Sequence, residues 1–268
     1  MKNILVTLSV ILFGFLLYSC EGPKGDVGLT GPEGEQGETG ATGAEGPSLS
    51  GSISGFVDLW DVSGNQILPS PLTKVSIYEK NITVACDSNG RWQIDSLTSG
   101  IYDLTFELDG YGTYIKKSLQ FVGGNELYYG RITLGQIPDY YVSTVSATNN
   151  GDQITFTGVF DNVPTTSSNI YCIIFIGTDS SVSSNPDQYL LAVFGKTDSN
   201  SFFSTVSSSK AIISGIKQGT KIYYKAYGCS YLSYNLAKEG GYYIDPQTGR
   251  SAYSCLSEQS SPVGSLDF

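Results

Sequence analysis

The sequence contains few side chains that could carry out acid–base or metal chemistry. Histidine, the commonest general base and metal ligand, is absent from all 268 residues. Asp103 and Glu107 could in principle form the carboxylate pair of a glycoside hydrolase. Both fall in a predicted strand over residues 100–108 with no cleft motif around it, so solvated charge is the simpler interpretation. The sequence therefore predicts a non-enzymatic protein with no catalytic residues, no cofactor and no metal site.

A tyrosine-rich insertion between the last two predicted strands is the most promising binding loop. The strands are expected over residues 221–229 and 251–256. Tyrosine rings can stack on sugar rings, because they combine an apolar face with a polar tip. The alternative is a hairpin whose tyrosines cover the edge of a sheet. The candidate ligand-binding residues are Tyr231, Tyr234, Tyr242 and Tyr243.

Four cysteines follow Cys20, an even number that suits an oxidising compartment. Three pairings are compatible with four cysteines. We expect a disulfide between Cys229 and Cys255, because neighbouring final strands would bring them close. Cys86 and Cys172 are then interpreted as small buried apolar residues.

The N-terminus carries a targeting signal. Residues 1–19 contain Lys2, then an apolar run over residues 4–18 that is shorter than the ~20 residues needed to span a bilayer. This segment resembles a bacterial lipoprotein signal, with residues 17–20 in the position of the lipobox, which implies cleavage before Cys20 and lipidation of Cys20. An ordinary secretory signal or an uncleaved anchor with a chance cysteine is the alternative.

The charge balance limits the partners. With 25 acidic and 15 basic residues, the chain should be repelled by nucleic acids and anionic headgroups. Contact with the membrane is therefore expected through the lipid on Cys20 and not through a basic patch.

Nine consecutive Gly-x-y triplets occupy residues 22–48. Only glycine fits at the axis of a collagen triple helix, so this period is the one that such a helix demands. The segment resembles the collagen-like stretches of Bacteroidetes lipoproteins. A single lysine opposes five carboxylates, which would repel one another in three aligned chains, so a monomeric flexible tether is favoured over a homotrimer. The charged residues are Lys24, Asp26, Glu33, Glu35, Glu38 and Glu45.

Residues 51–137 show short alternating segments separated by turn signals, which predict an antiparallel β-sandwich. Gly55-Phe56-Val57, the run 87–92 (DSNGRW) and Gly110-Tyr111 occur in an order that resembles the carboxypeptidase regulatory-like domain. That family is a transthyretin-like sandwich without catalysis of its own. Asn89-Gly90 is expected to form a hairpin turn and not half of a calcium loop, and Trp92 and Tyr102 are expected in the core.

Residues 138–268 form a second β-pattern. The segment 170–176 is apolar throughout and should lie centrally between two covered faces, and residues 210–213 are predicted as a short strand. The run from Ile216 to Tyr227 resembles the penultimate strand of fibronectin type III-like domains in Bacteroidetes surface proteins.

Together these patterns predict an all-β protein with two antiparallel β-sandwich domains after a cleaved signal and an extended tether. The expected divisions are 1–19, 20–50, 51–137 and 138–268. The resemblances imply a lipoprotein of the cell envelope, anchored to the outer membrane and exposed at the surface, that binds a glycan or another surface protein. The alternative is a structural spacer or adhesin without a small ligand.

Overall fold

The computed structural model describes residues 25, 28, 49–165, 169–235 and 240–268. Residues 47–268 make up one compact unit. The predicted signal, Cys20 and the Gly-x-y segment apart from Gly25 and Gly28 lie outside the described residues. Within the described part, no helix is both long and apolar enough to cross a membrane.

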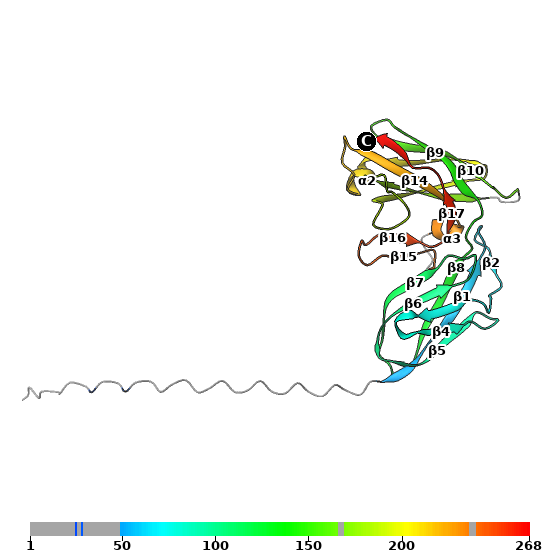
Figure 1. Ribbon diagram of the computed structural model, residues 1–268, viewed down its shortest axis with the longest axis vertical. Helices are drawn as coiled ribbons and strands as arrows, with labels where there is room; N and C mark the ends of the chain where they lie inside the picture. Colours follow the sequence, from blue (N-terminus) through cyan, green and yellow to red (C-terminus); the bar gives the residue numbers. More distant parts are fainter. Residues whose placement is uncertain (1–24, 26–27, 29–48, 166–168, 236–239) are drawn as a thin grey trace, which may run out of the picture. The chain divides into compact units, whose positions relative to one another are not determined.

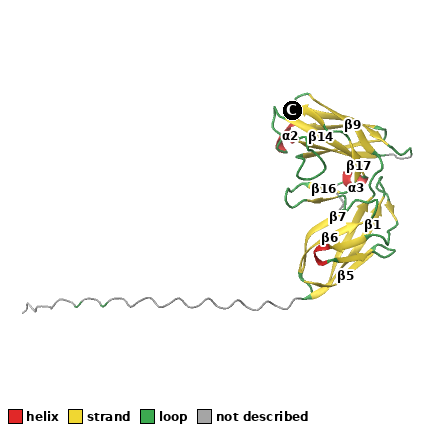
Figure 2. Cartoon of the chain, viewed as in Figure 1, coloured by secondary structure: helices red, strands yellow, loops and turns green. Residues whose placement is uncertain are grey.

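The chain is an all-β protein, as the sequence predicts, and strands dominate both halves of the compact unit (Figures 1 and 2). Every pair of described strands is antiparallel except one. β1 (Ser50–Trp60) pairs in parallel with β8 (Glu126–Gly135). This pairing brings the two ends of the first half together in one sheet, and short-range alternation alone does not reveal it.

The first sandwich consists of two sheets. In the β1 sheet, β1 pairs on one edge with β8 and on the other with β5 (Arg91–Thr98) and the short β2 (Gln66–Ile67). The β6 sheet has the order β4 (Ile82–Ala85), β3 (Lys74–Ile77), β6 (Gly100–Glu107) and β7 (Tyr114–Phe121). A single turn of 3-10 helix, η2 (Tyr78–Lys80), connects β3 and β4.

Alternate residues of both sheets fill the core of the first sandwich. Trp92 and Tyr102 are 1% and 4% exposed, so both are core residues as predicted. The Trp92 ring meets Phe106 edge to face at 5.5 Å, an orientation that aromatic quadrupoles favour. The Asn89-Gly90 turn is also confirmed, because the Asp87 carboxylate accepts the backbone N–H groups of Asn89 and Arg91, and Gly90 has φ +78°.

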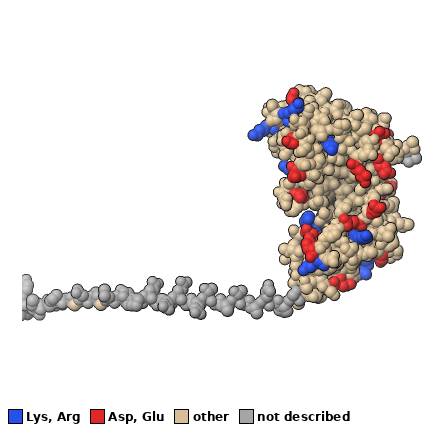
Figure 3. All heavy atoms as spheres, in the orientation of Figure 1, with Lys and Arg blue, Asp and Glu red and all other residues tan. Residues whose placement is uncertain are grey.

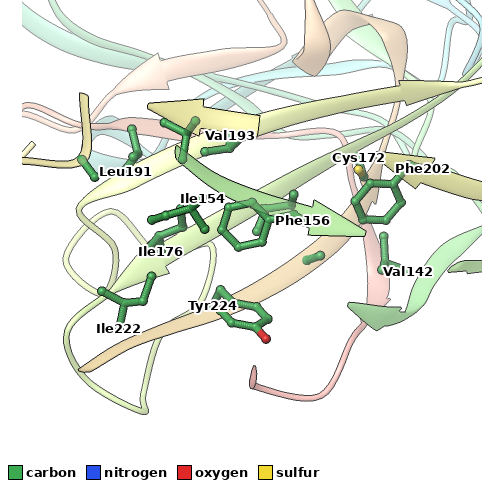
Figure 4. Close-up of a cluster of buried hydrophobic side chains, with 14 of the residues drawn as sticks. Val142, Ile154, Phe156, Cys172, Ile176, Leu191, Val193, Phe202, Ile222 and Tyr224 are labelled. Carbon is green, nitrogen blue, oxygen red and sulfur yellow. The ribbon is translucent and has the colours of Figure 1, made fainter. Parts of the chain in front are cut away.

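The second sandwich packs a three-stranded sheet on a five-stranded one. The β10 sheet has the order β13 (Ser201–Ser207), β10 (Gln153–Asp161) and β9 (Tyr141–Asn149). The β11 sheet has the order β12 (Leu191–Thr197), β11 (Ile170–Gly177) and β14 (Lys221–Cys229), whose far edge pairs with β17 (Leu256–Ser260) and β18 (Gly264–Asp267). Figure 4 shows the core between them, with Phe156 among aliphatic side chains and the Cys172 sulfur beside Phe202.

Strand β11 is buried along all eight residues, which confirms the predicted central position. One face contributes Cys172, Ile174 and Ile176 to the core in Figure 4. The opposite face contributes Tyr171, Ile173 and Phe175 to a second cluster. This second cluster lies outside the two packed sheets, so other parts of the chain must cover it.

Two predicted elements differ from the structure. Residues 210–213 belong to a short helix, α2 (Ser208–Ile213), because the Ser207 side chain accepts the Lys210 N–H and caps it. The expected strand over 251–256 is broken in two. β16 (Ser251–Tyr253) pairs with β15 (Tyr242–Ile244), whereas β17 pairs with β14.

The central position of β11 makes a testable prediction about stability. Ile174→Ala should lower the free energy of unfolding by about 2–5 kcal/mol, because it removes a fully buried side chain and leaves a cavity. Val159→Ala, on a side chain that is 40% exposed, should change it by no more than about 0.5 kcal/mol. Thermal and urea unfolding followed by circular dichroism measures both. Equal effects of the two substitutions would contradict the assignment of β11 as the centre of the core.

Candidate binding site

The four candidate tyrosines of the insertion are all half-buried. Tyr231 and Tyr234 form the single turn α3 (Tyr231–Tyr234), and Tyr242 and Tyr243 lie in β15. The structure thus brings all four into one segment, but on different elements with different neighbours.

Tyr231 contacts both sandwiches. Its ring stacks on Trp60 of β1, with 6.3 Å between ring centroids and 11° between ring planes. Its backbone N–H donates to the Val62 carbonyl at 2.9 Å. On the other side, its ring lies 5.6 Å from Tyr171 of β11. The ring is therefore a packing contact between the two halves of the compact unit.

The other three tyrosines also have packing partners. The Tyr234 ring lies 4.7 Å from Tyr171 and 5.9 Å from Phe194, and the Tyr242 ring lies 6.3 Å from Tyr253. Tyr243 packs against the core of the first sandwich. This geometry favours the alternative interpretation, a hairpin that covers a sheet. Glycan stacking by these four residues stays an untested prediction.

Glycines allow the insertion to lie directly against the first sandwich. A Cβ on Gly240, which has φ +114°, would lie 1.6 Å from the Thr133 carbonyl oxygen, and a Cβ on Gly112 would lie 2.2 Å from the Ser254 carbonyl oxygen. No side chain fits at either position. The glycine pair Gly240-Gly241 is visible in the sequence. That a side chain is excluded at Gly240 becomes clear only from the Thr133 backbone that lies opposite it.

The four described cysteines are free and buried, so the structure does not contain the predicted Cys229–Cys255 bridge. In the ladder, Cys229 lies opposite Leu256 and not Cys255. The Cys255 thiol also contacts the first sandwich, because its sulfur lies 2.9 Å from where a Cβ on Gly135 would be. Burial raises the pKa of both thiols. Cys86 and Cys172 are buried as predicted, and burial raises the pKa of Cys86 to about 12.

A cleft of about 1220 Å³ opens where the two sandwiches meet. Backbone hydrogen bonds hold its walls in place. The Ile137 N–H donates to the Gly110 carbonyl, and the Gly112 N–H donates to the Gly135 carbonyl, both at 2.9 Å. The lining residues are Pro71, Leu72, Lys74, Ala85, Glu107, Leu108, Asp109, Gly110, Tyr111, Thr113, Gln136, Ile137, Pro138, Asp139, Asn162, Ser257, Glu258 and Gln259.

Carboxylates dominate the charge of the cleft. Glu107, Asp109, Asp139 and Glu258 line it against one cation, Lys74. Among the described residues, the side chains of Asp109, Asp139 and Glu258 have no ion pair and no hydrogen bond. Glu107 differs, because it accepts the Tyr78 hydroxyl at 2.7 Å. Acidic side chains are also more widespread than basic ones on the face shown in Figure 3.

The cleft offers hydrogen-bonding groups and one aromatic ring. The side-chain amides of Gln136, Asn162 and Gln259 supply donors and acceptors, and the unpaired carboxylates supply acceptors. The Tyr111 ring adds apolar surface, and burial followed by the charge of Asp61 raises the pKa of its hydroxyl. A ligand rich in hydroxyl groups matches this composition.

Acid–base chemistry by Asp103 and Glu107 has no geometric support. Glu107 lines the cleft, but Asp103 does not. Asp103 accepts the Lys117 ammonium and the Ser118 N–H, each at 2.8 Å. Burial opposes ionisation, but these two hydrogen bonds hold the pKa of Asp103 below its ordinary value. Within the described residues, no group of three or more metal-ligating side chains is present.

No protein-family model matches the chain, and no curated protein matches it. The resemblances to carboxypeptidase regulatory-like and fibronectin type III-like domains therefore stay predictions, as do the domain boundaries.

Three solved structures illustrate the similarity that exists. A candidate carbohydrate-binding protein from Bacteroides uniformis is 14% identical with a TM-score of 0.29, over 82% of this chain and 100% of that one. A DUF3823 family protein from Parabacteroides merdae is 12% identical with a TM-score of 0.30, over 82% and 100%. Another DUF3823 family protein, from Bacteroides uniformis, is 10% identical with a TM-score of 0.29, over 83% and 100%. Similarity at this level supports no inference about function, which rests on the geometry of the site.

The packing role of Tyr231 can be tested. Tyr231→Ala should lower the free energy of unfolding by about 1–3 kcal/mol, because it removes stacking on Trp60 and half-buried apolar area. Phe203→Ala, on an aromatic side chain that is 64% exposed, should change it by no more than about 0.5 kcal/mol. A Tyr231 variant of unchanged stability that loses glycan binding would restore the original prediction for the insertion.

The thiols make a second prediction. Iodoacetamide in denaturant without reductant should label all of Cys86, Cys172, Cys229 and Cys255, because the structure has four free thiols. The native protein should react slowly, since burial raises the thiol pKa values and the thiolate is the nucleophile. Intact mass counts the labels. Labelling of Cys86 and Cys172 alone would establish the Cys229–Cys255 bridge.

Proposed function

We propose that this protein is a non-catalytic, lipid-anchored binding protein of the bacterial cell envelope that takes a glycan ligand in the cleft between its two sandwiches. The cleft is the observation that carries the proposal. It combines three unpaired carboxylates, three side-chain amides and the Tyr111 ring in about 1220 Å³. Hydroxyl groups of a saccharide satisfy carboxylate acceptors and amides at the same time, and an aromatic ring accepts the apolar face of a sugar.

Three features of the site favour binding over catalysis. The protein has no histidine, and its two most plausible acid–base carboxylates do not share the cleft. Asp103 is held ionised by Lys117 and Ser118, which suits an ion pair and not a proton donor. The cleft walls are tied by backbone hydrogen bonds between residues 110–112 and 135–137, which would preorganise a binding surface.

Display at the membrane is part of the proposal. Cys20 would carry the lipid, and the Gly-x-y segment would act as a monomeric tether that keeps the sandwiches away from the outer membrane. The chain's net charge of −10 supports attachment through acyl chains and not through electrostatic attraction to anionic lipid.

The cleft proposal predicts a specific loss of binding. The double variant Asp109→Ala, Glu258→Ala should have an affinity at least about tenfold lower for the glycan that the unaltered protein binds most tightly. The reason is that the variant lacks two carboxylate hydrogen-bond acceptors of the cleft. The matched control is Asp152→Ala with Asp198→Ala, which removes the same charge from exposed positions outside the cleft and should leave affinity unchanged. Isothermal titration calorimetry on the full chain in detergent compares them. Equal losses in both variants would show a general charge effect and refute the cleft site.

The anchoring proposal is tested at Cys20. Cys20→Ser should abolish incorporation of radiolabelled palmitate and move the protein out of the membrane fraction, because no basic patch would retain it. A Cys20→Ser protein that stays in washed membranes would contradict lipid anchoring.

A further inference from the structure

The outer face of the β1 sheet carries a group of interacting side chains. On β1, Val57 and Leu59 point toward the core, whereas Phe56 and Asp58 point away from it. We call this group the Arg–aromatic face. Its members are Phe56, Asp58, Arg91, Gln93, Asp95, Glu126, Tyr128 and Arg131.

The arginines are concentrated on this face. The whole sequence contains three arginines, and two of them flank Phe56 in the ladder, since Phe56 pairs with Arg91 on one edge of β1 and with Arg131 on the other. Two strand spacings separate their backbones, about 10 Å. Both side chains are about half exposed, at 49% and 54%.

The aromatic rings of the face are close and partly open to solvent. The Arg131 guanidinium carbon lies 4.6 Å from the Phe56 ring centroid, which is a cation–π contact. The Tyr128 ring meets Phe56 edge to face at 6.5 Å and is 58% exposed. An exposed tyrosine and a half-exposed guanidinium therefore both contact the Phe56 ring.

Both cations of this face lie beside carboxylates. Arg131 Nη1 lies 2.7 Å from Asp58 Oδ1, and Arg91 Nη2 lies 3.9 Å from Glu126 Oε1. The Arg91 guanidinium also donates to the Gln93 amide oxygen at 2.8 Å. The Gln93 amide in turn donates to the Asp95 carboxylate at 2.6 Å. On a chain with a net charge of −10, this face therefore carries two cations and two anions in pairs and one further carboxylate. An anionic ligand gains nothing from this balance.

Hydrogen-bonding capacity remains after these pairings. A guanidinium has five N–H donors. Among the described residues, Asp58 is the one side chain that accepts from Arg131, and Gln93 is the one that accepts from Arg91. The remaining donors are planar, charge-assisted and oriented by their ion pairs, which suits vicinal hydroxyl groups.

We propose that the Arg–aromatic face binds a neutral glycan chain, with one sugar ring on Tyr128 and hydroxyl groups hydrogen-bonded to Arg91 and Arg131. The occupant follows from the charges and the donors of the face. The surplus carboxylate disfavours uronates and sulfated glycans, whereas a neutral polyhydroxyl chain uses the guanidinium donors without disturbing the ion pairs. This site is separate from the cleft, since none of its members lines the cleft.

The test uses the full chain in detergent with immobilised neutral polysaccharides (xylan, mannan and mixed-linkage β-glucan) and acidic ones (polygalacturonate and heparin). At least one neutral polysaccharide should bind, and Tyr128→Ala should weaken it about tenfold or more through lost stacking. Arg131→Lys should weaken it while preserving charge, because lysine lacks the planar fork. The matched control is Phe203→Ala, which removes an aromatic ring that is 64% exposed on the second sandwich and should leave affinity unchanged.

The outcomes separate this site from the cleft. If Tyr128→Ala loses polysaccharide binding and the double variant Asp109→Ala, Glu258→Ala binds fully, the result supports the Arg–aromatic face as the glycan site and refutes the cleft. If the double variant loses binding and Tyr128→Ala binds fully, the result refutes the Arg–aromatic face and supports the cleft. Binding of acidic polysaccharides alone, or of no polysaccharide, overturns the inference. Thermal unfolding of each variant confirms that lost binding is not lost folding.

Discussion

The structure depends on one constraint, a central strand that is apolar on both faces. β11 must bury two rows of side chains, one that includes Ile174 and one that includes Phe175. Exposing either row would lose the favourable free energy of burying several large apolar side chains. The β10 sheet covers the first row. The second is covered by Tyr189 from the loop before β12 and by Tyr253 from the insertion, whose rings lie 4.9 Å and 5.7 Å from Phe175. The loop and the hairpin are tied together by Arg250, which donates to the Pro186 carbonyl at 2.8 Å.

The same insertion also contacts the first sandwich, which covers part of Tyr231 and of Tyr243. Tyr231 lies between Tyr171 and Trp60, so one ring serves both halves of the compact unit. Close backbone approaches at Gly240 and Gly112 reinforce this contact. The cleft is a consequence of the docking, since strand and loop residues of both sandwiches form its walls. Residues that bind ligand are therefore expected at the rim of the junction and on outer sheet faces, and not in the aromatic insertion.

Much of the fold was predictable because it follows from local periodicity. Alternation in β1, β6, β10 and β14 marked one face for a core, and the unbroken apolar run of β11 marked a strand covered twice. The errors arose where a hydrogen bond outweighed the pattern. Ser207 caps a helix over residues predicted as a strand, and the pairing of β16 with β15 separates residues that read as one strand. The candidate site was harder to foresee, because Asp109, Asp139 and Glu258 lie far apart in sequence and resemble ordinary surface carboxylates until the fold brings their segments together.

The sequence by itself determined the all-β class, the central position of β11, the burial of Trp92 and Cys172, and the absence of histidine chemistry, since all of these depend on residue type and short-range order. Only the tertiary structure decided the parallel pairing of β1 with β8, the burial of Cys229 and Cys255 as free thiols, and the packing role of Tyr231. Each of these depends on which distant segment lies opposite a given residue. Ring stacking, thiol proximity and strand register are properties of pairs, and a linear sequence specifies the members of a pair without stating that they meet.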